Sequence, residues 1–89
     1  RQAIYNTKLW HDMRNATMLR DNGLCQRCLK DFDRVTPATD IHHIDSFMNY
    51  QGEERLKAAF DYDNVVCLCK HCHSVVHLYP KTNSKWIKR

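Results

Sequence analysis

Glycine and proline are scarce in this chain of 89 residues, which contains two of each. This scarcity excludes a low-complexity linker, and no internal repeat is visible, so the sequence predicts one domain over residues 1–89. No apolar run approaches the roughly 18 residues that a membrane-spanning helix needs. No signal-peptide pattern opens the sequence either. We therefore expect an intracellular protein in a reducing compartment, without membrane association.

Histidine and cysteine, in contrast, are abundant, with six and five residues. A domain of this size buries a limited core and is often held together by a metal ion or by disulfides. In a reducing compartment, clustered cysteines favour metal binding over disulfides. The formal net charge of +4 is compatible with a polyanionic partner but does not establish one.

A first helix is predicted over residues 5–20, because apolar side chains recur there at helical spacing. The expected buried face consists of Leu9, Met13 and Ala16, with Trp10 and Thr17 beside them. Asn6 or Thr7 is suited to cap the start of this helix. Gly23 is suited to end it in a left-handed turn.

The remaining predicted elements are shorter. Residues 24–32 are expected to form a tight turn around two cysteines. Strands are predicted over 38–44 and 65–68, and helices over 53–60 and over 73–79, the latter ending before Pro80. In the helix at 53–60 the side chains expected to face inward are Leu56, Ala59 and Phe60.

Two matched cysteine pairs carry the strongest local signal. Cys25-x-x-Cys28 and Cys69-x-x-Cys72 together offer four thiolates, enough to complete a tetrahedral structural zinc site that takes no part in chemistry. Such a site would clamp the two segments together. Each pair alone could instead be buried thiols or a redox pair. Cys67 is left over and is predicted to be a buried strand residue.

Four histidines suggest a second site. His73 and His77 are four residues apart on a predicted helix, a spacing that suits one metal ion. His42 and His43 are adjacent on a predicted strand, so their side chains point to opposite faces. One of them could join the helical pair, and the other could accept a proton near neutral pH. Alternatively, the helical pair is solvated and the adjacent pair is packed and structural.

The segments DIHHI, DYDNVVCLC and CHSVVH together resemble the motifs of HNH endonucleases, also called His-Me finger or ββα-metal nucleases. The four-cysteine pattern and the lead-in YNTKLWHDMR are similar to small HNH proteins of bacteriophages and mobile elements. The resemblance implies an α+β fold, a small zinc-stabilised ββα-metal domain. Its parts would be an N-terminal helix at about 5–20, a zinc clamp and core at about 24–79, and a basic tail at 80–89. It also implies action in the cytoplasm of a bacterial host.

The resemblance also assigns roles by position. His43 matches the general base that activates water. Asn64 matches a residue that usually bonds across the loop and holds this base, although in some relatives an asparagine of this region binds the metal. Asp40 has no firm counterpart and could orient an imidazole from behind. The residues that match ligands of the catalytic metal are His42, His73 and His77.

The implied activity is hydrolysis of DNA phosphodiester bonds with one divalent ion, leaving 5′-phosphate and 3′-hydroxyl ends. Magnesium is the expected ion, although imidazole ligands also suit manganese, nickel or zinc. Phage packaging proteins are a further class of partner that the resemblance suggests. Alternatives are a non-catalytic, zinc-stabilised DNA-binding module of the same fold and a zinc ribbon that docks a partner protein. The complete set of His42, His43, Asn64 and His73 favours the enzyme.

Contacts with DNA phosphates are expected from lysines and arginines near the site. Trp86 could stack on a base. Each cation could instead be solvated, and no element that reads sequence is visible, so specificity is expected to be low or supplied by a partner. The candidates are Lys8, Arg14, Arg20, Arg27, Lys30 and Lys70, together with Lys81, Lys85, Lys88 and Arg89 in the tail.

Overall fold

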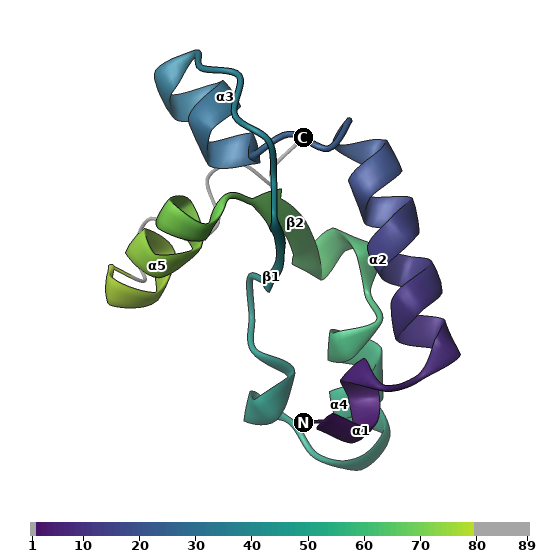
Figure 1. Cartoon of the computed structure of the whole chain (residues 1–89). Helices are drawn as coiled ribbons and strands as arrows, with labels where there is room; N and C mark the ends of the chain where they lie inside the picture. The colour runs from purple at the N-terminus through teal and green to yellow at the C-terminus, as the bar shows by residue number, and fades with distance from the viewer. Residues whose placement is uncertain (1, 80–89) are drawn as a thin grey trace.

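The computed structural model describes residues 2–79, in which short helices surround a small antiparallel hairpin (Figure 1). This arrangement confirms the predicted α+β class. The predicted basic tail at 80–89 lies outside the described residues. Within the described part, no helix has both the length and the apolar character needed to cross a membrane. The elements are α1 (Gln2–Tyr5), α2 (Lys8–Arg20), α3 (Gln26–Phe32), β1 (Asp40–His43), η1 (Phe47–Asn49), α4 (Gly52–Ala59), η2 (Tyr62–Asn64), β2 (Val65–Leu68) and α5 (Lys70–Leu78).

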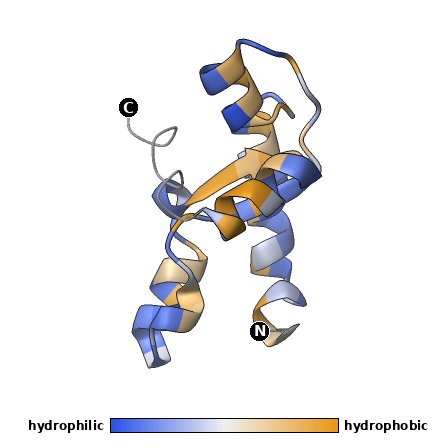
Figure 2. Cartoon of the chain, turned by 90° about the vertical axis from the view of Figure 1, so that its left-hand side faces the viewer, coloured by the Kyte–Doolittle hydropathy of each residue, from blue (hydrophilic) through white to orange (hydrophobic). Residues whose placement is uncertain are grey.

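The hairpin separates two sides of the molecule. β1 pairs with β2 so that His42 lies opposite Val66 and His43 lies opposite Val65. Because neighbouring strand residues face opposite sides, Val66 packs with the cysteine pairs and α5, whereas Val65 packs with the buried face of α2. Figure 1 shows α2 and α5 on opposite sides of the hairpin. Figure 2 shows apolar residues concentrated in the middle of the folded molecule. β2 is buried along its whole length.

The first predicted helix begins at Lys8 rather than at residue 5, and Thr7, one of the two predicted caps, precedes it. The separate short helix α1 comes before it. The Thr7 hydroxyl accepts a hydrogen bond from the Trp10 amide and so caps the start of α2. The predicted face is partly wrong, since Leu9 and Ala16 are exposed and the buried residues of α2 are Trp10, Met13 and Thr17. Burial of a threonine is tolerated there because its hydroxyl donates to the Met13 carbonyl at 2.7 Å. As predicted, Gly23 takes a left-handed conformation after this helix, with φ of 66°.

Each cysteine pair lies at the start of a helix, although a turn was predicted around the first pair. The Cys25 sulfur accepts from the Cys28 amide at 3.4 Å, and the Cys69 sulfur accepts from the Cys72 amide at 3.5 Å. Both first cysteines therefore cap the helix that follows them. This explains why α3 replaces the predicted turn and why α5 begins at Lys70, earlier than the sequence predicted.

The two strands and the helix α4 between them agree with the prediction in part. β2 has its predicted bounds, whereas β1 is shorter than the strand predicted over 38–44. In α4 the expectation for Leu56 is wrong, because 51% of it is exposed. The expectation for Ala59 is confirmed, because its small side chain is buried against Ile4 and Phe47, and Phe60 is half-buried. This contact holds α4 close to α1 and η1.

Candidate active site

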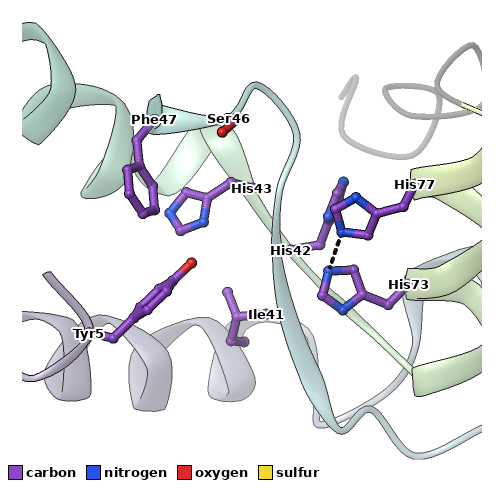
Figure 3. A pocket seen from close by; sticks show the side chains of 8 residues that line it. All are labelled: Tyr5, Ile41, His42, His43, Ser46, Phe47, His73 and His77. Atoms are coloured by element: carbon purple, nitrogen blue, oxygen red, sulfur yellow. Dashed lines mark hydrogen bonds between the residues drawn. The ribbon is translucent and has the colours of Figure 1, made fainter. Parts of the chain in front are cut away.

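Three histidines from two elements converge beside the hairpin. His42 is buried on β1, and His73 and His77 project from α5, with one ligand nitrogen of each lying within 4.8 Å of the others. The Nε2 atoms of His73 and His77 are 3.1 Å apart (Figure 3). Two imidazole nitrogens on one tetrahedral ion would be about 3.4 Å apart at usual bond lengths. The spacing therefore suits one divalent ion that keeps coordination positions open.

Asp40 fixes the orientation of one of these rings. Its Oδ2 atom lies 2.7 Å from Nδ1 of His73. Partial burial alone would raise the pKa of Asp40, but the hydrogen bond with His73 lowers it below its usual value. An ionised carboxylate only accepts hydrogen bonds, so Nδ1 of His73 carries the proton and Nε2 presents its lone pair to the other histidines.

His43 occupies the other side of β1 and is held by a different set of groups. Its Nε2 atom lies 2.9 Å from the carbonyl oxygen of Ala59. Because a carbonyl only accepts, Nε2 carries the proton and Nδ1 has a lone pair available. The ring stacks on Trp10 at a centroid distance of 5.3 Å and meets the edge of Phe47 at 4.9 Å. Burial lowers the pKa of His43 below its ordinary value of 6.5, which favours the neutral form.

Asn64 links the chain that follows His43 to the end of α4. Its Oδ1 accepts from the Asp45 amide at 2.8 Å, and its Nδ2 donates to the carbonyls of Asp45 and Ala58 at 2.8 and 2.9 Å. Ala58 precedes the residue whose carbonyl binds His43. The geometry is therefore that of a brace behind His43, rather than of a ligand among the three clustered histidines.

The two sides meet in one pocket of about 180 Å³ that extends over β1. Figure 3 shows His43 on one side of this strand and the three clustered histidines on the other. A pocket that spans the strand brings a neutral imidazole and a candidate metal site to the same space. It is lined by Tyr5, Ile41, His42, His43, Ser46, Phe47, His73 and His77.

The four paired cysteines form a second cluster, with all their sulfur atoms within 4.8 Å of one another. The sulfur of Cys28 lies 4.0 Å from that of Cys69 and 3.6 Å from that of Cys72. A tetrahedral zinc site with bonds of about 2.3 Å would separate its sulfurs by about 3.8 Å. The cluster therefore fits a structural zinc site, as predicted.

Two arginines partly offset the charge of this cluster. Arg27 donates to the sulfur of Cys72 and Arg34 to that of Cys28, each at 3.4 Å, and both guanidinium groups lie over the ring of Phe32. Burial alone would raise the pKa of Cys28, but hydrogen bonds from Thr36 and Arg34 lower it to about 6. A zinc ion bound by four thiolates carries two net negative charges, so both arginines are well placed.

Cys67 lies apart from this cluster. It is fully buried on β2, and its sulfur is 3.6 Å from the carbonyl oxygen of Thr17. Burial raises the pKa of its thiol to about 12, so the thiol stays protonated at neutral pH. The prediction of a buried strand residue is confirmed.

The side chains predicted to contact DNA phosphates differ in the hydrogen bonds and ion pairs that they already make within the protein. Arg20 donates to both carboxylate oxygens of Asp21 and to the carbonyls of Tyr62 and Val65, so its guanidinium joins α2 to η2 and β2. These bonds, and those of Arg27 to the cysteine cluster, argue against phosphate contact by either. Lys8 pairs with Asp12 on an exposed face. The side chains of Arg14, Lys30 and Lys70 are exposed, whereas Lys81, Lys85, Trp86, Lys88 and Arg89 lie outside the described residues.

Several groups at the pocket were not predicted as functional from sequence. The carbonyl that binds His43 belongs to Ala59. Every residue has a backbone carbonyl, so the amino-acid sequence does not indicate which one takes this role. Trp10 and Phe47 enclose His43, but only Trp10 was noted, as part of an apolar face. Tyr5 also lines the pocket, at the end of α1. The available sequence signal is the pair of aromatic residues Tyr5 and Trp10 in the lead-in segment, far before the histidine motif in the chain.

Comparisons with known proteins agree with this geometry. The family model described as HNH endonuclease matches residues 25–77. A solved structure, the HNH endonuclease of the deep-sea thermophilic bacteriophage GVE2 with manganese ion, is similar at a TM-score of 0.77 and 31% sequence identity. The similarity covers 91% of this chain and 82% of that one. No curated protein matches the chain by sequence.

Proposed function

Because the chain belongs to the HNH endonuclease family, we propose that this nuclease hydrolyses DNA phosphodiester bonds with one divalent ion and with His43 as general base. The observation that carries the proposal is the pocket over β1. It combines a half-buried, neutral imidazole that has an acceptor nitrogen available with three imidazoles spaced for one ion.

His42, His73 and His77 would hold the ion, with Asp40 orienting His73 from behind. The similar phage enzyme is described with manganese, which supports a divalent ion here. Manganese and magnesium are the expected ions, and nickel or zinc also suits three imidazoles. Such an ion would stabilise negative charge on the phosphate and on the departing oxygen.

His43 would accept a proton at Nδ1 from the attacking water, while its Nε2–H stays bonded to Ala59. The water oxygen forms a bond to phosphorus as the bond from phosphorus to the 3′ oxygen breaks. That 3′ oxygen takes up a proton from solvent. The products are then a 5′-phosphate and a 3′-hydroxyl, and no oxidation or reduction occurs.

Asn64 would act as a positioning residue. Its amide connects the segment that follows His43 to the end of α4, whose carbonyl at Ala59 binds His43. It would therefore keep Nδ1 of His43 directed into the pocket. A proton acceptor displaced by about 1 Å can lose on the order of 100-fold in rate, so such a brace is useful even without contact to substrate.

The test is cleavage of supercoiled plasmid in magnesium or manganese, compared with EDTA, by the wild type, His43→Ala and His11→Ala. His11 is an exposed histidine of α2 outside the pocket, so its variant controls for loss of an imidazole. We expect metal-dependent nicking or linearisation that is lost in His43→Ala only. All three proteins should retain about one zinc per chain, because the cysteines are unchanged. Cleavage that survives His43→Ala would exclude this base, and no cleavage by the wild type would favour a non-catalytic DNA-binding module.

A further inference from the structure

The side chain of Tyr5 is held by the same two aromatic rings that hold His43. Its ring meets Trp10 edge-on at a centroid distance of 5.0 Å and Phe47 at 5.7 Å. Trp10 and Phe47 also contact the His43 ring, at 5.3 and 4.9 Å. The positions of the phenol and the imidazole are therefore coupled through shared neighbours.

The backbone that carries Tyr5 is also well anchored. Ile4 is buried against Phe47 and Ala59. Thr7 closes the turn after α1, with its hydroxyl donating to the Ile4 carbonyl at 2.8 Å. A residue anchored on both sides is suited to present its side chain in one direction.

That direction is into the pocket. Tyr5 is half-buried and lines the pocket together with His43 and the three clustered histidines. Figure 3 shows the phenol oxygen directed toward the side of the pocket that His43 occupies. The hydroxyl thus lies where the substrate of the proposed reaction would be bound.

The lining of the pocket contains no lysine or arginine among the described residues. A phosphodiester bound there gains negative charge on its non-bridging oxygens during attack, and hydrogen-bond donors aimed at these oxygens lower the barrier. The histidines are assigned to the ion and to the base. The remaining side-chain donors in the lining are the hydroxyls of Tyr5 and Ser46. Ser46 is exposed at the start of η1, whereas Tyr5 is half-buried among the aromatic rings that also contact His43.

We propose that Tyr5 is a further catalytic residue whose hydroxyl donates a hydrogen bond to a non-bridging oxygen of the phosphate being cleaved. This inference rests on the proposed nuclease function. Nothing in the proposal requires the phenol to ionise, because a hydroxyl both donates and accepts hydrogen bonds.

The test uses Tyr5→Phe, which removes one oxygen and retains the ring that packs on Trp10 and Phe47. Tyr62→Phe is the matched control, since Tyr62 is an exposed tyrosine of η2 outside the pocket lining. The substrate is a duplex oligonucleotide whose cleavage position has first been mapped. It is prepared with an ordinary phosphate at that position, or with a single phosphorothioate as separated Rp and Sp isomers.

We expect single-turnover cleavage of the ordinary duplex by Tyr5→Phe to be about 10- to 100-fold slower, which is at or below the lower end of the range for loss of one such donor because Tyr5 is half-buried. DNA affinity, zinc content and thermal midpoint should match those of Tyr62→Phe. Sulfur accepts hydrogen bonds weakly, so the loss should shrink to a few-fold on the isomer that places sulfur at the oxygen bound by Tyr5. A structural role would not depend on the isomer.

The outcomes separate the two proposals. A wild type that cleaves, with Tyr5→Phe equally fast, overturns the role of Tyr5 and leaves the nuclease function standing. An equal loss on the ordinary duplex and on both isomers excludes a bond to a non-bridging oxygen. A wild type that cleaves no duplex overturns the nuclease function and the role of Tyr5 with it.

Discussion

Replacing Asn64 with alanine should reduce both stability and cleavage, for a reason that can be worked out from three bonds. The amide of Asn64 makes hydrogen bonds of 2.8 to 2.9 Å with the amide and carbonyl of Asp45 and with the carbonyl of Ala58. Each such bond contributes a net of about 0.5–1.5 kcal/mol. The surroundings are partly exposed, so water would replace some of this, and we expect a loss of about 2 kcal/mol in unfolding free energy.

For a chain of this size, that loss corresponds to a fall of about 8–16 °C in the thermal midpoint. The zinc-loaded protein should therefore be followed by scanning calorimetry or by circular dichroism on heating. Asn49→Ala is the matched control, because the Asn49 amide makes one exposed hydrogen bond with Asp45, at 3.1 Å. We expect the control to change the midpoint by less than a quarter as much.

The cleavage rate should fall by on the order of 100-fold in Asn64→Ala. The variant lacks the hydrogen bond to the Ala58 carbonyl, so the neighbouring Ala59 carbonyl, which binds His43, is held less firmly. Manganese affinity, measured by calorimetric titration, should be unchanged, since the amide lies outside the histidine cluster. Loss of manganese affinity with an unchanged thermal midpoint would refute this reasoning and make Asn64 a metal ligand. An unchanged cleavage rate would also refute it.

Three further expectations concern protons and metals. The single-turnover rate should fall as pH decreases through the lowered pKa of His43, because the base must be neutral; a midpoint above 6.5 under saturating metal would contradict burial as the dominant cause. Asp40→Asn should weaken manganese binding by about 10- to 100-fold in calorimetric titration, whereas Asp12→Asn on the exposed face of α2 should not. Cys72→Ser should lose zinc and cooperative folding by metal analysis and circular dichroism, whereas Cys67→Ala should retain the zinc; equal zinc content in both variants would exclude the four-cysteine site.

The residues with specific chemistry were the most predictable from sequence. Paired cysteines at fixed spacing indicate a metal cluster because few other arrangements use four thiols. The strand Val65–Leu68 was predicted with its observed bounds, because a short run of β-branched and apolar residues suits a buried strand. His42 and His43 were expected to face apart from strand geometry alone, and the structure places them on opposite sides of β1.

Elements whose position depends on tertiary contacts were less predictable. Leu56 and Ala59 were both expected to face inward, but α4 approaches α1 and η1 through Ala59 alone of the two, where a small side chain permits close packing. Leu9 is exposed because the face centred on Trp10, Met13 and Thr17 meets the hairpin. Arg27 was expected to contact DNA, and its partner is a sulfur that is 45 residues away in sequence. Helical spacing indicates which residues share a face, but it does not indicate which face meets a partner.

The adjacency of His42 and His43 has a consequence for how the site tolerates motion. The two imidazoles depend on separate supports, one formed by α5 and the other by α2, η1 and the end of α4. Their backbone positions are nevertheless joined by one peptide unit, whose ends are about 3.8 Å apart whatever the helices do. Relative movement of the flanking helices can tilt either ring, but it leaves the distance between the two attachment points unchanged. The attachment points of the proton acceptor and of one metal ligand are therefore kept together by covalent bonds, whereas packing sets the orientation of each ring.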